Sequence, residues 1–293
     1  MSMTSTYALL LLSALIWGFQ PVLVKDLLHY LNPPTIISFR WAGVGCLLLF
    51  YLYFHDRARF WPLKKDWPVL AFMGLTGIMG NSVLQFTGLK YTMVTNSTLI
   101  TAITPALTAL IAFFLLRERL SAKSWLGILL AFSGVLIIIT QGNPALLINL
   151  KFNYGDILCF LSQISWALYT LASKRVVDHL HIMASLGWSS LFGSGFTFLY
   201  AVLSGTMRPV PLPQMQYLSL LFMILMGGIA VNLCWNVGVK YAGPSLTSVF
   251  LNVAPVVGMI SGHIFLGDPL GPVQVTGALI CFAGVYLTTH GTK

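Results

Sequence analysis

Long apolar stretches alternate with short polar breaks along the whole chain. A membrane-spanning helix needs roughly 20 consecutive apolar residues, and ten stretches of about that length can be marked. None of the polar breaks between them is long enough to hold a soluble domain. The pattern therefore predicts an all-α membrane protein with ten transmembrane helices. The expected spans are residues 7–27, 35–54, 68–88, 95–116, 123–141, 154–173, 182–204, 217–238, 245–266 and 272–290.

The composition agrees with a lipid environment. The chain has 293 residues, of which 57% are hydrophobic and only 8% are charged, whereas soluble domains carry about 25% charged residues. The first apolar stretch lacks a basic flank and a clear cleavage site, so we expect a span there and not a signal peptide. The four cysteines fall within expected spans, without the spacing of disulfides or of a metal site. No metal and no cofactor is predicted.

Lysine and arginine are distributed unevenly between the two sides of this expected bundle. If the N-terminus is cytoplasmic, the cytoplasmic segments hold eleven of them and the external segments hold four, while Arg40 lies within a span. Cytoplasmic loops of membrane proteins are enriched in these two residues. The split predicts that both termini are cytoplasmic. It also accounts for the net charge of +9 without a nucleic-acid partner.

A short phrase occurs twice in the chain. GLKY at residues 88–91 returns as GVKY at residues 238–241, and in each copy a proline follows the tyrosine fourteen residues later, at Pro105 and Pro255. Glycine, lysine, tyrosine and proline are less common in apolar helices than leucine or valine. Their shared spacing therefore indicates a duplicated structural unit.

The duplication extends well beyond this phrase. A shift of 150 aligns residues 71–140 with residues 221–290 without a gap and gives 15 identities. We expect two repeats of five helices, in residues 1–145 and 150–293. Because five is an odd number, the second repeat enters the membrane from the opposite side, and the two repeats are inverted. Inverted repeats are a recurrent way to build a carrier that works by alternating access around a site near the midplane.

The charges of the two copies fit this inversion. RERLSAK at residues 117–123, expected on the cytoplasmic side, corresponds to GDPLGPV at residues 267–273, which has no lysine or arginine. An orientation rule that acts on a duplicated unit produces such a difference. Glu118 and Asp268 occupy equivalent positions at helix ends, where we expect a role in loop structure. A bundle with repeats but without transport is the structural alternative.

Four segments resemble a known family of carriers. They are ISFRWAGVGCLLLF (37–50), ITPALTALIAFFLLRERLSAKSWLGILLAFSGVLI (103–137), SWALYTLASKR (165–175) and VAPVVGMISGHIFLGDPLGPVQVTGALICFAGVYL (253–287). They are similar to the EamA branch of the drug/metabolite transporter superfamily, and the resemblance covers nearly the whole chain. It implies a ten-helix, two-repeat carrier, typically an exporter of amino acids, metabolites or drugs. It does not identify the substrate.

Two tryptophans lie near the middle of their expected spans. Trp17 corresponds to Trp166 at a repeat shift of 149. Tryptophans of the interfacial belt lie at helix ends, so the pair is a candidate wall for an aromatic or apolar substrate, together with Tyr169. Packing within the bundle is the alternative. Trp188 and Trp235 lie closer to span ends, where the belt is the better interpretation.

Polar side chains within spans are the default candidates for a substrate cavity. Gln20 shares a helix face with Trp17, and Asn81 and Gln85 follow one helical stripe of the third span. A hydrogen bond across to a neighbouring helix is the structural alternative for these amides. The eighth and ninth spans add three further amides, Asn232, Asn236 and Asn252.

Four further residues have features of substrate binding, gating or proton transfer. Arg40 is a cation inside a span, which indicates either an anchor for a substrate anion or a side chain that reaches outward to the interface. Pro105 and Pro255 interrupt helical hydrogen bonding and are candidate hinges. His263 is a mid-span histidine, which is either a structural group or a proton site.

The distribution of acidic residues limits the function. No carboxylate lies at the middle of an expected span, which disfavours exchange of protons for organic cations and favours a neutral, zwitterionic or anionic solute. Proton coupling would need His263 or a displaced acid. The expected spans contain no set of residues for catalysis, so an enzyme is not predicted.

We therefore expect an exporter of small organic metabolites, amino acids or related solutes, in the inner membrane. A multidrug or nucleotide-precursor carrier and a flippase of lipid-linked groups are the alternatives. The lipid bilayer and a small solute are the expected partners, and the protein is a monomer or a homodimer.

Overall fold

The computed structural model describes residues 3–116, 121–143, 153–208, 210–243, 247 and 250–291. The regular structure of these residues is helical throughout. The helices are α1 (Met3–Leu27), α2 (Pro33–His55), η1 (Arg57–Arg59), η2 (Lys64–Asp66), α3 (Trp67–Met73), η3 (Gly74–Gly80), α4 (Asn81–Tyr91), α5 (Val94–Thr101), α6 (Thr104–Leu116), α7 (Ala122–Ile139), α9 (Tyr154–Val177), α10 (Ile182–Leu203), α11 (Gln214–Ile224), η4 (Leu225–Ala230), α12 (Val231–Ala242), η5 (Phe250–Asn252), α14 (Val253–Leu266) and α15 (Pro272–Gly291).

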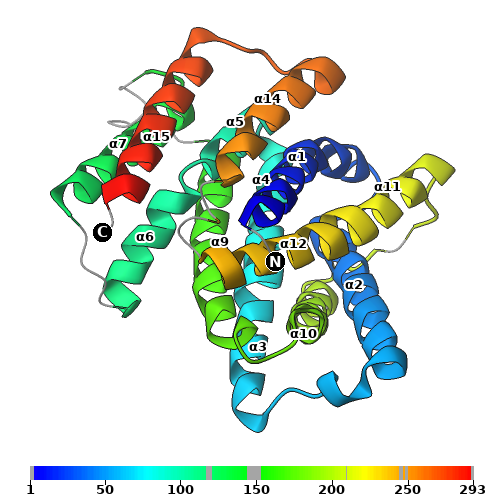
Figure 1. Ribbon diagram of the computed structural model, residues 1–293. Coiled ribbons are helices and arrows are strands. Elements are labelled where there is room, and N and C mark those ends of the chain that lie inside the picture. Colours follow the sequence, from blue (N-terminus) through cyan, green and yellow to red (C-terminus); the bar gives the residue numbers. More distant parts are fainter. Residues whose placement is uncertain are drawn as a thin grey trace.

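Helices that are distant in sequence pair across the bundle. Figure 1 shows α7 beside α15 on one flank and α2 beside α10 on another. Between these pairs, α1 packs on α12 and α14, and α9 packs on α4 and α6. Each pairing joins one helix from before residue 145 to one from after residue 150. The bundle is therefore held together by contacts between its two sequence halves.

Six of these helical segments are long and apolar enough to cross a membrane, and three shorter apolar helices accompany them in the described part of the chain. Helix α9 is 24 residues long but carries Asp156, Lys174 and Arg175. The ten-span count and the placement of the termini stay predictions. The six long segments are Thr4–Leu27, Pro33–His55, Lys64–Tyr91, Val94–Leu115, Ile182–Leu203 and Gln214–Ala242, and the shorter helices are Ala122–Ile138, Val253–Leu266 and Pro272–Leu287.

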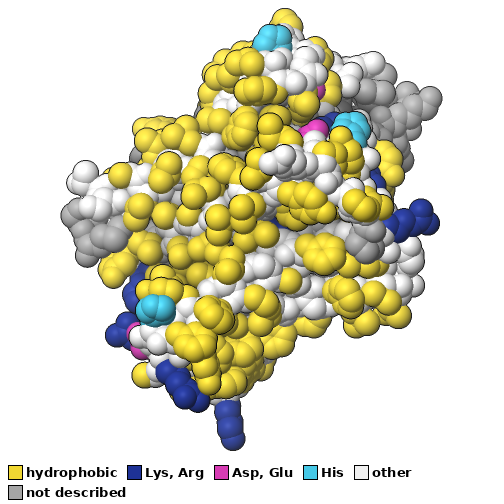
Figure 2. Space-filling model, turned by 90° about the vertical axis from the view of Figure 1, so that its right-hand side faces the viewer, with side chains coloured by type: hydrophobic (Ala, Val, Ile, Leu, Met, Phe, Trp, Pro, Cys, Tyr) yellow, Lys and Arg dark blue, Asp and Glu magenta, His cyan; other side chains and the backbone are white. Residues whose placement is uncertain are grey.

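The outer surface of the bundle is apolar. Phe50, Phe114, Leu203 and Ile264 are each more than 60% exposed. Figure 2 shows hydrophobic side chains across most of the visible face, with lysines and arginines at its margins. Water-soluble proteins rarely expose apolar patches of this extent. The surface therefore fits a hydrocarbon environment.

Glycines of the two halves make reciprocal contacts. A Cβ atom on Gly88 would lie 2.7 Å from Cys159 Sγ, and one on Gly238 would lie 2.5 Å from Leu10 Cδ2. Gly238 is the repeat counterpart of Gly88, and Leu10 precedes Cys159 by the repeat shift of 149. The first half therefore packs on the second at these positions in the way that the second packs on the first.

The third and eighth expected spans each contain a π-helical turn, η3 and η4, at equivalent positions of the repeat. Gly77 in η3 lies directly against Tyr169, and its counterpart Gly227 lies directly against Gln20. Tyr169 and Gln20 are themselves related by the shift of 149. No local sequence signal predicts a π turn, because such turns arise where a helix adapts to its neighbours.

The fourth and ninth expected spans are both interrupted before their prolines. Helix α5 ends at Thr101, and α6 begins at Thr104 with Pro105 in its first turn. Pro255 lies in the first turn of α14, directly after the short 3₁₀ turn η5. Proline is tolerated in the first turn of a helix because its missing N–H has no helical partner there. Helix α5, which precedes the first break, packs against α14, which follows the second.

Candidate functional site

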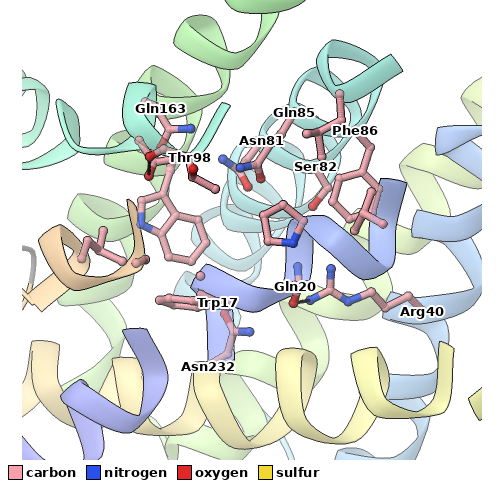
Figure 3. A pocket seen from close by; sticks show the side chains of 18 of the residues that line it. Trp17, Gln20, Arg40, Asn81, Ser82, Gln85, Phe86, Thr98, Gln163 and Asn232 are labelled. Carbon is pink, nitrogen blue, oxygen red and sulfur yellow. Dashed lines mark hydrogen bonds between the residues drawn. The ribbon is translucent and has the colours of Figure 1, made fainter. Parts of the chain in front are cut away.

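A cavity of about 100 Å³ lies where the two halves meet. Figure 3 shows that its walls come from helices on several sides of the bundle. Seven of the ten residues predicted from the sequence to bind substrate line it: Trp17, Gln20, Arg40, Asn81, Gln85, Trp166 and Asn232. The lining is completed by Gly18, Pro21, Val24, Trp41, Ser82, Phe86, Leu89, Thr98, Thr101, Gln163, Leu251 and Ala254.

Arg40 forms one end of the cavity. Its side chain is 2% exposed, and Nε donates to Met223 O at 3.1 Å. Nη2 donates to Gln20 Oε1 at 3.0 Å (Figure 3) and to Gly227 O at 2.9 Å. The centroid of the Trp41 ring lies 4.9 Å from the guanidinium carbon Cζ of Arg40. Helices α1 and α11 and the π turn η4 therefore hold the guanidinium of α2 in one orientation.

Among the described residues, no carboxylate compensates the charge of Arg40. None of the ion pairs in the described residues includes Arg40. Nη1 has no acceptor among these residues, whereas Nε and Nη2 each have one or more. A buried cation without a counter-ion is energetically costly. The arrangement therefore suits an anion that enters the cavity, and it does not fit the alternative in which Arg40 reaches outward to the interface.

Aromatic rings form the opposite wall. The rings of Trp17 and Trp166 meet edge to face with centroids 5.3 Å apart, and Trp166 stacks on Tyr169 at 4.9 Å. Trp235 contacts both tryptophans, at 5.4 and 5.6 Å. The predicted belt position of Trp235 is wrong, because this residue is 1% exposed and lies inside the bundle. Its place follows from the close packing of α12 on α1 and α9.

The predicted amides differ in their positions. Asn81 lines the cavity and donates through Nδ2 to Ser162 O at 3.0 Å. Asn232 lines it as well, and its Nδ2 donates to Gly228 O at 2.9 Å. Asn236 lies behind the aromatic wall, with Nδ2 3.4 Å from the hydroxyl of Tyr169. The side chain of Asn252 lies outside the described residues.

Gln163 is a lining residue that the sequence analysis missed. Its Oε1 accepts from Thr104 Oγ1 at 2.9 Å, and its Nε2 donates to Ser162 Oγ at 2.8 Å. It lies on α9 three residues before Trp166, and residues at this spacing share a helix face. That spacing was the signal that could have found it.

The remaining predicted residues lie away from the cavity lining. Pro105 and Pro255 flank the helix breaks described above. His263 is exposed on α14, and its Nδ1 lies 2.9 Å from the backbone oxygen of Asp268. Asp268 Oδ2 accepts a hydrogen bond from the backbone nitrogen of Thr95 at 2.9 Å. It thereby caps the first turn of α5, in agreement with its expected role at a helix end, whereas Glu118 lies outside the described residues.

The chemistry of the cavity is that of binding. It offers one buried guanidinium, several amides and a wall of aromatic rings. No group of three or more histidine, cysteine, aspartate or glutamate residues that could hold a metal ion occurs in the described part of the chain. An apolar helical bundle around such a cavity defines a membrane carrier.

Comparisons with known proteins agree with this class. The sequence model of the EamA-like transporter family matches residues 4–140 and again residues 153–290. The chain belongs to this family, and it is a multi-pass membrane transporter and not an enzyme. The family model matches the chain twice, once in each half, which agrees with the internal repeat found in the sequence.

Two relatives cover nearly the whole chain. The uncharacterized transporter YyaM of Bacillus subtilis (strain 168) is 32% identical over 97% of this chain and 93% of its own length. A protein of Salmonella typhimurium (strain LT2) named a probable amino-acid metabolite efflux pump is 28% identical over 97% of this chain and 95% of its own length. A crystal structure at 17% identity aligns with a TM-score of 0.71 over 100% of this chain and 99% of that chain, which supports the fold.

Proposed function

We propose that this transporter exports small organic solutes that carry a carboxylate, namely amino acids or closely related metabolites. The solute occupies the cavity, with its carboxylate at Arg40 and its side chain toward Trp17 and Trp166. The observation that carries the proposal is the buried guanidinium of Arg40, which no carboxylate of the described residues neutralises. Charge-assisted hydrogen bonds of this kind are about twice as strong as neutral ones.

The size of the cavity supports a small solute. Its volume of about 100 Å³ is well below the roughly 300–1,000 Å³ of sites that bind drug-sized ligands. This favours amino acids over the alternatives of a multidrug carrier, a nucleotide-precursor carrier or a flippase. The name of the Salmonella typhimurium relative, a probable amino-acid metabolite efflux pump, points to the same class of solute and to export.

Alternating access between two inverted repeats, residues 1–145 and 150–293, is the proposed mechanism. The reciprocal glycine contacts and the equivalent π turns support a twofold relation between the repeats. The helix breaks at Pro105 and Pro255 supply the hinges. We propose ten spans in the inner membrane with both termini cytoplasmic. This orientation is tested with membrane-impermeant thiol labels on single cysteines introduced into two loops, residues 56–63 and residues 204–208. A cysteine in the loop at 56–63 should react from the cytoplasmic side, and one in the loop at 204–208 should react from the outside.

The function is tested by transport in proteoliposomes. Purified protein is reconstituted, and efflux of a labelled panel of amino acids, their carboxamides and organic cations is measured against empty liposomes. We expect flux of amino acids and little flux of the carboxamides. Transport of the cations in preference to the amino acids would contradict the proposal.

A further inference from the structure

A buried carboxylate lies outside the cavity, at the start of α9. Asp156 is 0% exposed, and it is one of only seven acidic residues in the chain. Its repeat counterpart at the shift of 149 is Tyr7, which is not acidic. The carboxylate is therefore specific to one end of the bundle and is not required by the repeated fold.

The carboxyl oxygens of Asp156 differ in their partners. Oδ1 accepts a hydrogen bond from Thr92 Oγ1, whereas Oδ2 is buried and has no partner among the described residues. The side chain of Asn96 lies within hydrogen-bonding reach of this carboxyl, and Asn96 Oδ1 is itself buried without a partner among the described residues. A buried acceptor without a donor is unfavourable, because the hydrogen bonds it made to water are not replaced.

Protonation of Asp156 would supply the donor that these two buried oxygens lack. A proton on Asp156 Oδ2 makes that oxygen a donor, which the amide oxygen of Asn96 can accept. When the carboxyl is ionised, the same amide can present its Nδ2 group instead, because an asparagine side chain has both a donor and an acceptor end. The pair therefore suits both protonation states.

None of the charged and titratable groups near Asp156 in the described part of the chain pairs with its carboxylate. Lys25 of α1 donates through Nζ to the backbone oxygens of Leu89 and Thr92, at 2.6 Å each. Asp268, after α14, accepts from the backbone of Thr95. Cys159, one turn further along α9, donates to Ser97 Oγ. Asp156 forms none of the ion pairs of the described residues. A buried carboxylate without a cation is costly in its charged form.

Asp156 is connected to the cavity along one face of α9. Positions 156, 159, 163 and 166 recur at helical spacing, and Gln163 and Trp166 line the cavity. Gln163 Nε2 also lies 3.3 Å from the backbone oxygen of Cys159. Seven helical residues correspond to a distance of about 10 Å along the axis. A change at Asp156 is therefore two turns from the residues that contact a solute.

From these contacts we infer that Asp156 is the proton-binding residue of this transporter. It takes up one proton from water when its end of α9 is accessible and returns the same proton to water later in the cycle. The ionised form accepts from Thr92 and holds the start of α9 against α4. Protonation makes the carboxyl a weaker acceptor for the Thr92 hydroxyl, and it thereby loosens the contact between the start of α9 and α4. Proton binding is a property of the protein by itself, whereas its coupling to solute flux rests on the proposed function.

Infrared difference spectroscopy tests the proton site without a solute. The protein in nanodiscs is stepped from alkaline to acid pH, and the C=O band of a protonated, buried carboxyl is recorded with and without deuterium exchange. The small number of acids makes the assignment tractable. We expect a titrating band that is lost in Asp156→Asn and retained in Asp26→Asn, whose carboxylate pairs with Gln216. A band that persists in Asp156→Asn, or its absence from the wild type, would overturn the inference.

A second pair of variants guards against a folding defect. Thr92→Val removes the donor to Oδ1, so the band should appear at higher pH than in the wild type. Asn96→Ala should shift the frequency of the band, and replacement of sodium by choline should leave it unchanged. An unmoved titration in Thr92→Val together with an unmoved band frequency in Asn96→Ala, or a band that sodium abolishes, would overturn the inference.

Proteoliposomes then test the coupling. A pH gradient should drive accumulation of an amino acid by the wild type, whereas Asp156→Asn should only equilibrate it. If the wild type only equilibrates the amino acid but still shows the titrating band, Asp156 binds a proton that does not drive transport. That result would contradict the coupling and support the proton site. Absence of any flux would count against the proposed function alone.

Discussion

The rings of Trp17 and Trp166 meet edge to face, with centroids 5.3 Å apart and planes at 87°. The two residues are equivalent in the internal repeat and are separated by 149 positions. The contact therefore lies where the two halves face each other, at the wall of the cavity. A substrate that fits beside these rings contacts both halves at once.

Loss of either ring should weaken transport more than folding. Trp17→Ala and Trp166→Ala should raise KM for aromatic amino acids, because ring contacts of this kind contribute about 0.5–1.5 kcal/mol each beyond burial. Trp17→Phe should retain most of the affinity. Flux in proteoliposomes measures the effect, and Trp125→Ala on α7, outside the lining, is the control. Wild-type KM in both alanine variants would mean that the rings serve packing only.

Arg40→Lys should separate solutes by charge. Lysine keeps the charge but lacks the planar guanidinium, whose several donors can bind Gln20 and a substrate carboxylate at the same time. A charged hydrogen bond contributes about 1.5–3 kcal/mol, so KM for amino acids should rise roughly 10- to 100-fold, while KM for uncharged analogues should change little. Arg175→Lys, at the exposed end of α9, is the matched control. Equal losses for charged and uncharged solutes would assign Arg40 to structure.

Two glycines of α10 should respond differently to the same substitution. A Cβ on Gly193 would lie 2.7 Å from Gly74 O and against Ile78, whereas a Cβ on Gly195 meets nothing within 4 Å. Gly193→Ala should therefore destabilise the bundle by about 1–3 kcal/mol, the range typical of overpacking. Gly195→Ala should be neutral or slightly stabilising, because alanine favours the helix. Unfolding in mixed micelles compares the two, and equal stabilities would contradict the close packing of α10 on η3.

Asp268 should stabilise the start of α5 from outside that helix. Its Oδ2 accepts from Thr95 N at 2.9 Å, and loss of a capping side chain costs about 0.5–2 kcal/mol. Asp268→Ala should lower the free energy of unfolding by that amount. Asp178→Ala, which removes only an exposed pair with Lys174, should have a smaller effect. Similar losses in both variants would argue against the cap.

His181, in the loop before α10, should reduce stability in acid. Burial lowers the pKa of this histidine, and Arg59 and Lys240 lower it further while Asp56 opposes them. Its folded pKa therefore lies below the unfolded value of about 6.5. The unfolded state binds the proton first, so stability falls as the pH drops through 6.5 and levels off below the folded pKa. His181→Gln should flatten this fall. An unchanged acid profile in His181→Gln would contradict the prediction.

Seven of the ten residues predicted to bind substrate line the cavity, because polar side chains and mid-span tryptophans stand out inside apolar spans. Arg40, Gln20 and Asn81 stand out for this reason, and all three line the cavity. Trp235 and Gln163 were not predicted. Their positions depend on the rotation of α12 and α9 against helices of the other half of the chain, and the rotation of a helix in lipid is set by its neighbours.

Composition and repetition by themselves determined the membrane class, the helical fold and the two related halves. These properties follow from the apolar length of each segment and from glycines and prolines that recur at a fixed interval. The tertiary structure decided what these patterns leave open: the π turns beside Gly77 and Gly227, the carbonyl partners of Arg40 and the isolation of the Asp156 carboxylate. Each of these features depends on contacts between residues of the two halves. The periodicity of residues within one helix does not specify which residues of another helix it will contact.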